Sequence, residues 1–159
     1  MRTQWTSMLC AGLMAVWISA CSDHKHSHGD HGHGHVHTAP HGGTLVEIGQ
    51  HAFNLEFVRD PAKGLLTAYV LDGHAENFVR LPIPSFSVAA ELGGKTETLV
   101  LSAVANSQTG EKVGDTSQFE VTADFLKSPG ALKGAVPNLE IRGQKFESIQ
   151  FTLPETKQQ

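Results

Sequence analysis

Cysteine is scarce in this chain of 159 residues, where only Cys10 and Cys21 occur. The sequence after residue 21 contains no thiol, which excludes an internal disulfide and a thiolate metal site there. Tryptophan is absent after Trp17 and Tyr69 is the only tyrosine, so phenylalanine and aliphatic residues must form the core. The chain also lacks the HExxH, GxSxG and P-loop motifs, and we expect no enzymatic activity.

The first 20 residues have the pattern of a secretion signal. Arg2 is their only charge, a mostly apolar stretch spans residues 5–18, and the small residues Ser19 and Ala20 follow. A retained transmembrane anchor is the alternative, but a bilayer span needs about 20 apolar residues. Because this run is shorter and interrupted by polar residues and glycine, we predict that residues 1–20 are a cleaved signal peptide.

The segment Ile18-Ser19-Ala20-Cys21 resembles the lipobox of bacterial lipoproteins, in which the cysteine is acylated and becomes the first residue of the mature chain. Leucine is the usual first residue of that motif, so Ile18 is a departure from it. The resemblance implies a lipid anchor on Cys21 and a place in the bacterial cell envelope. In a Gram-negative bacterium, Ser22, where inner-membrane lipoproteins usually have aspartate, favours an outer-membrane lipoprotein facing the periplasm. A plain secreted protein is the alternative.

Basic residues are few as well, since 12 lysines and arginines stand against 16 acidic residues and give a net charge of −4. Loss of residues 1–20 removes Arg2 alone and leaves 11 basic against 16 acidic residues, a charge of −5. Nucleic-acid-binding proteins have the opposite balance, so we expect no nucleic-acid partner.

Histidine is concentrated directly after the lipobox-like segment, with eight of the ten histidines between residues 24 and 41. Residues 21–40 contain so few apolar side chains that we predict a flexible, lipidated tail. An extended chain rises about 3.3 Å per residue, so alternate imidazoles point to one side and can converge on one ion. Imidazole suits the divalent ions of Zn, Cu and Ni. The predicted ligands are His24, His26, His28, His31, His33, His35, His37 and His41.

The rest of the chain, residues 41–154, has the pattern of short strands separated by Gly, Pro and Asn. This spacing is typical of an antiparallel sandwich or barrel, and we predict an all-β, antiparallel β-sandwich of about seven to nine strands followed by a disordered end at 155–159. A helix in residues 125–136 is disfavoured by Pro129, Gly130 and Gly134, whereas residues 124–127 can form one turn. The expected strands are 44–48, 51–58, 65–71, 85–92, 96–104, 118–123, 139–142 and 146–153.

The first two strands predict a hairpin with Gly49-Gln50 as its turn. In that register Ile48 lies opposite His51, and Val46 lies opposite Phe53. One face of the hairpin is then apolar, and the other holds Glu47 and Glu56.

Three histidines flank or enter the folded part, and together they suggest a possible secondary metal site. His51 lies beside the predicted turn, His74 lies in a loop, and His41 precedes a pair of glycines. With Glu47, Asp72 or Glu76 they could form a defined site, but each alone is more often an ordinary surface histidine.

The stretch from Pro40 to Gly49, with residues 56–60 and 66–72, resembles a recurring module of small, His-rich bacterial lipoproteins that contain an HGG sequence. Similar segments occur near the N-termini of periplasmic adaptor subunits of heavy-metal efflux pumps. The resemblance covers about residues 24–80 and implies metal handling without assigning ligands. We therefore expect a metal-binding envelope lipoprotein that acts as buffer, sensor or donor to a metal-efflux partner. The alternative is a non-catalytic interaction module whose tail is a spacer.

Overall fold

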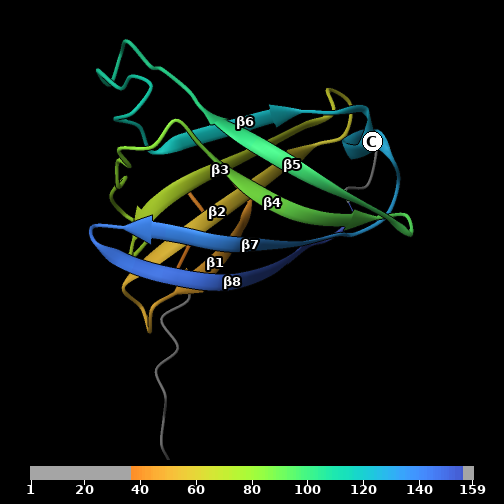
Figure 1. Ribbon diagram of the computed structural model, residues 1–159, viewed down its shortest axis with the longest axis horizontal. Helices are drawn as coiled ribbons and strands as arrows, with labels where there is room; N and C mark the ends of the chain where they lie inside the picture. Colours follow the sequence, from red (N-terminus) through yellow and green to blue (C-terminus); the bar gives the residue numbers. More distant parts are fainter. Residues whose placement is uncertain (1–36, 156–159) are drawn as a thin grey trace, which may run out of the picture. The chain divides into compact units, whose positions relative to one another are not determined.

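The computed structural model describes residues 37–155, which form an all-β fold of eight strands (Figure 1). The predicted fold class and number of strands are confirmed. The predicted signal peptide, Cys21 and the histidines from His24 to His35 lie outside the described residues. Within residues 37–155 no helix has the length and apolar character that a membrane crossing requires. The strands are β1 (Thr44–Ile48), β2 (Phe53–Asp60), β3 (Leu65–Asp72), β4 (Ser85–Leu92), β5 (Lys95–Ala103), β6 (Gln118–Thr122), β7 (Leu132–Ile141) and β8 (Gln144–Leu153).

All eight strands belong to one sheet in the order β1-β2-β3-β6-β5-β4-β7-β8, and every neighbouring pair is antiparallel. The sheet curls until its edge strands, β1 and β8, lie side by side (Figure 1). The two layers expected of a sandwich are therefore opposite sides of one continuous, nearly closed sheet. Its concave face encloses the core, and its convex face is available for other contacts.

Alternation of side chains along the strands produces this core. In β4, Phe86, Val88, Ala90 and Leu92 point inward and are buried, while the residues between them are more exposed. Full burial of an aliphatic or phenylalanine side chain contributes about 1.5–3 kcal/mol. The core therefore stabilises the fold without any disulfide.

The hairpin of β1 and β2 has its predicted faces but a different register. Ile48 pairs with Phe53 and Val46 with Leu55, a shift of two residues from the expected pairing. The predicted two-residue turn is wrong, because a four-residue connection from Gly49 to Ala52 closes with a hydrogen bond between its ends. A shift by an even number of residues leaves each side chain on its face, so the apolar side still meets the core.

Strand β7 begins at Leu132, seven residues before the predicted strand 139–142. The strand contains Pro137, which is unusual because proline has no N–H for a sheet ladder. The structure accommodates it because pairing of β7 with β4 spans only Lys133 to Ala135, and Pro137 is skipped in the pairing with β8. The expected single turn appears as the 3-10 helix η1 (Asp124–Lys127).

Arg59 closes one end of the core from the inner face of β2. Its guanidinium donates two hydrogen bonds to the carbonyl oxygen of Leu126, at 3.0 and 2.9 Å, and further bonds to the carbonyls of Ser128 and Gly130. Burial lowers the pKa of Arg59, and the charge of Glu155 opposes this effect. The buried guanidinium of Arg59 therefore fixes the segment after η1 by hydrogen bonds to its carbonyl oxygens.

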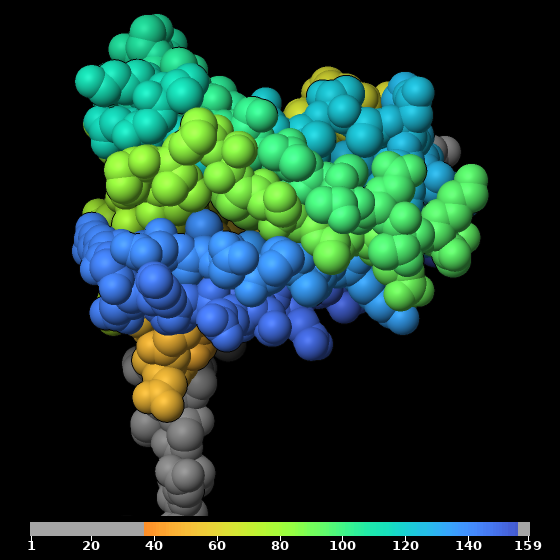
Figure 2. Space-filling model, viewed as in Figure 1, coloured from red at the N-terminus to blue at the C-terminus, as the bar shows by residue number. Residues whose placement is uncertain are grey.

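The connection between β5 and β6, residues 104–117, projects from the body as the teal lobe in Figure 2. Glu111 holds its base, where Oε1 accepts hydrogen bonds from the amide and hydroxyl of Ser117 at 2.9 and 2.7 Å. Burial opposes ionisation of Glu111, but these bonds, a bond from Thr109 and the charge of Arg80 outweigh it and lower its pKa. The lobe is therefore an ordered extension of the sheet.

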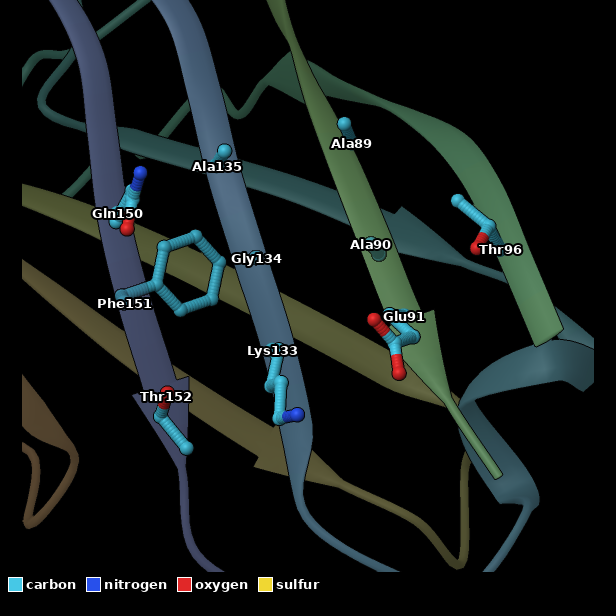
Figure 3. A pocket seen from close by; sticks show the side chains of 10 residues that line it. All are labelled: Ala89, Ala90, Glu91, Thr96, Lys133, Gly134, Ala135, Gln150, Phe151 and Thr152. Carbon is cyan, nitrogen blue, oxygen red and sulfur yellow. The ribbon is translucent and has the colours of Figure 1, made fainter. Parts of the chain in front are cut away.

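Gly134 makes room for an aromatic ring in the wall formed by β7 and β8. Figure 3 shows the Phe151 ring lying beside Gly134 on the neighbouring strand. The ring also stacks on Phe57 from the other side of the core, with centroids 3.9 Å apart. A Cβ atom on Gly134 would lie 2.1 Å from Cζ of Phe151, so the position requires glycine.

We expect Gly134→Ala to destabilise the domain by about 1–3 kcal/mol, because the stacked ring has no space into which to move. Urea unfolding of residues 22–159 measures this cost. Addition of Phe151→Leu should recover part of the stability lost in Gly134→Ala, although Phe151→Leu alone is destabilising. Purely additive effects of the two substitutions would contradict the steric explanation.

Candidate functional site

A buried carboxylate organises the convex face of the sheet near the N-terminal end of the described chain. The Glu56 side chain points outward from β2, yet it is fully buried, because the segment before β1 covers it. Its Oε1 accepts hydrogen bonds from the amides of His41 and Gly43 at 2.8 and 2.9 Å. Its Oε2 lies 2.9 Å from Nδ1 of His41. We call this arrangement the Glu56 clamp.

The Gly42-Gly43 pair allows the clamp to form. Gly42 has a φ of +70°, a conformation that residues with a side chain rarely adopt. Gly43 lies so close to β2 that a Cβ atom would be 2.5 Å from the carbonyl oxygen of Phe57. The HGG sequence therefore has a structural role, in which each glycine meets a different backbone requirement.

An aromatic ring also stacks on the face of the His41 imidazole. It stacks on Tyr69 of β3, with centroids 3.6 Å apart and planes 8° from parallel. Phe78 lies at the edge of this pair, 5.7 Å from the centroid of His41, and half of Phe78 is exposed. Tyr69 is the direct neighbour of Glu56 across β2 and β3, so one position of the sheet supplies both the carboxylate and the ring.

This geometry determines which nitrogen of His41 is available to a ligand. A carboxylate only accepts hydrogen bonds, so Nδ1 carries the proton and the neutral ring keeps its lone pair on Nε2. Within residues 37–155 nothing hydrogen-bonds Nε2, and the side chain is 33% exposed. A histidine whose other nitrogen bonds a carboxylate is the usual arrangement of a metal-binding histidine. His41 therefore has the orientation of a ligand.

A second carboxylate orders the loop that contains His74. Asp72 Oδ1 accepts the amides of Glu76 and Asn77 at 3.0 and 3.3 Å, and Oδ2 accepts the side-chain amide of Asn77 at 2.7 Å. Burial opposes ionisation of Asp72, but these bonds outweigh it and lower its pKa. The His74 ring lies beside that of His37, with centroids 5.9 Å apart.

His51 takes a separate partner. Its Nδ1 lies 2.8 Å from Glu47 Oε2, and both side chains are well exposed, at 71% and 43%. Its backbone packs against Gly73, but its side chain is not part of the pair formed by His37 and His74. In the described part of the chain no three His, Cys, Asp or Glu side chains form a group that could hold a metal ion. The structure thus joins two of the predicted histidines and gives His41 and His51 carboxylate partners of their own.

No protein-family model, curated protein or solved structure matches this chain.

The clamp was not predicted from the sequence, although its residues were noticed. Glu56 was assigned to the polar face of the hairpin, which is correct, and such a position usually faces water. The sequence feature that indicates the clamp is the HGG motif. Its last residue, Gly43, lies 13 residues before Glu56 and permits close backbone approach.

We expect Glu56→Gln to destabilise the domain by about 1–3 kcal/mol, because the amide replaces an acceptor in a buried network of donors. Urea unfolding of residues 22–159 measures the loss. Glu47→Gln is the matched control, since it removes the carboxylate of an exposed histidine pair and should change stability by less than about 0.5 kcal/mol. Equal effects of the two substitutions would show that burial of Glu56 is unimportant.

Ionisation of the Tyr69 phenol provides a pH-dependent test of the convex face around Glu56. Burial raises its pKa, and the charges of Glu120 and Glu56 raise it further. The stability that Tyr69 contributes is therefore complete below its ordinary pKa of about 10 and is lost as pH rises through the higher folded value. Ultraviolet absorbance of residues 22–159 follows this one phenol, and we expect a midpoint above 10. Glu120→Gln should lower the midpoint, whereas Glu91→Gln on β4 should not. A midpoint of 10 or below in the folded protein would contradict this description.

Proposed function

We propose that this chain is a cell-envelope lipoprotein that binds divalent Zn, Cu or Ni through its His-rich tail. It serves as a buffer, sensor or donor linked to metal efflux. The observation that carries the proposal is the sequence itself, in which eight histidines follow a lipobox-like segment within residues 24–41. Imidazole ligation needs no preformed fold, so a tail of this composition is sufficient to bind such ions.

The Glu56 clamp supports this function in a specific way. It holds His41, the last of the eight predicted ligands, against the sheet, with Nδ1 on a carboxylate and Nε2 available. A carboxylate partner makes imidazole a better ligand and fixes its orientation. The tail therefore joins the domain next to a histidine whose Nε2 atom is oriented to accept a metal ion.

The alternative function, an interaction module with the tail as spacer, has one supporting feature. In the described residues β1 and β8 are the edges of the sheet and form no ladder with each other, although they lie side by side. Unpaired strand edges are common sites of protein association. Replacement of the tail histidines by serine separates the two functions, because an interaction module would keep its cellular role.

Removal of residues 22–39 should abolish most metal binding and leave the unfolding midpoint unchanged. The measurement is isothermal titration of Zn, Cu(II) and Ni into residues 22–159 and 40–159 at pH of about 7.5, where imidazole is neutral. The shorter protein keeps the Glu56 clamp, so both forms contain the complete sheet. Equal stoichiometry in the two proteins would contradict a tail site, and no binding in either would favour the interaction module.

Metal binding should also weaken as pH falls through about 6, because protonated imidazole has no lone pair for a metal and its ordinary pKa is about 6.5. The same titrations at several pH values measure this. Affinity that stays constant between pH of about 7 and 5 would instead indicate carboxylate ligands.

A further inference from the structure

His37 and His74 lie together where the tail meets the folded domain. Their ring centroids are 5.9 Å apart and their planes are nearly perpendicular, at 89°. Two imidazoles bound to one ion through bonds of about 2.0 Å keep their ring centres about 5–6 Å apart. The centroid separation of this T-shaped contact lies within that range, although the two rings come from segments 37 residues apart in the sequence.

A carboxylate outside the pair forms hydrogen bonds in the His74 loop, and another binds the chain a few residues after His37. His37 is four residues before His41, which Glu56 fixes to the sheet. His74 is in the loop that Asp72 orders through three hydrogen bonds. A metal site binds more tightly when its ligands are oriented in advance by surrounding contacts.

Close packing gives the loop a second restraint. A Cβ atom on Gly73 would lie 1.9 Å from the carbonyl oxygen of His51. The turn before β2 therefore packs closely against Gly73, the residue before His74. Ala75, on the other side of His74, is buried. The backbone on both sides of this exposed histidine is therefore held in place.

The two segments that contain the pair carry negative charge only. Residues 37–58 and 65–79 contain no lysine or arginine, and their charged residues are four acids: Glu47, Glu56, Asp72 and Glu76. Arg80, the next cation along the chain, is directed to Asp115 and to the carbonyl of Thr109. These two segments therefore place no positive side chain against a divalent ion bound by the pair.

We propose that His37 and His74 bind one divalent transition metal ion at the surface of the domain. This inference deepens the proposed function and rests on it, because it adds a defined site at the domain surface to which metal bound by the tail can transfer. Two imidazoles leave coordination positions open to water or to an incoming ligand. An ion held in this way exchanges more readily than one in a closed, four-ligand site, as a buffer or donor requires.

The test uses residues 22–159 with serine in place of the six histidines that precede His37, titrated with Zn at neutral pH. We expect this tail-silenced protein to bind one ion. Addition of His74→Gln should weaken the binding at least tenfold, since it removes one of two protein ligands. His51→Gln is the matched control, because His51 is also an exposed loop histidine but has its own carboxylate, Glu47. It should leave the affinity within about twofold.

Failure of this inference differs from failure of the proposed function. If the natural sequence of residues 22–159 binds several ions and the tail-silenced protein binds none, the pair is overturned and the tail remains the metal site. If both proteins bind a single ion that depends on His74, the pair is supported and the tail function is overturned. Equal binding with His74→Gln and His51→Gln would also overturn the pair. Because His74 is exposed, an unchanged unfolding midpoint verifies that His74→Gln is folded.

Discussion

The buried carboxylate of Glu56 is the interaction on which the arrangement of this protein depends. A carboxylate removed from water costs several kcal/mol unless hydrogen-bond donors replace its hydration. On this sheet three donors do so, and all belong to the segment before β1, from His41 and Gly43. The segment must therefore lie on the convex face of the sheet. The point at which the tail leaves the domain is fixed as a consequence.

This placement connects the sheet to the chemistry of the tail. The carboxylate orients His41, Tyr69 supports its ring, and the residues just before it reach the loop of His74. The pair formed by His51 and Glu47 has similar atoms and a similar distance, but both side chains are exposed, so solvent screens their interaction. Burial, rather than the presence of a histidine and an acid, distinguishes the clamp.

The sequence predicts the strands well because alternation and turn residues are local properties, and the bounds of β1, β4 and η1 agree with expectation. The register of the first hairpin was wrong by two residues, since three successive residues, Gly49 to His51, adopt positive φ and lengthen the turn. The start of β7 was missed because the tolerance of Pro137 depends on where the neighbouring strands stop pairing. The burial of Glu56 depends likewise on a segment folding back over it, which no periodicity encodes. The metal-binding tail is a prediction from composition alone.

X-ray absorption at the zinc edge tests the central claim, metal bound by histidine, most directly. The sample is residues 22–159 loaded with less Zn than the protein can bind. We expect a first shell of nitrogen and oxygen at about 2.0 Å, with the outer-shell scattering of imidazole rings and no sulfur. A shell of oxygen alone, without imidazole scattering, would contradict the claim and assign the metal to the carboxylates.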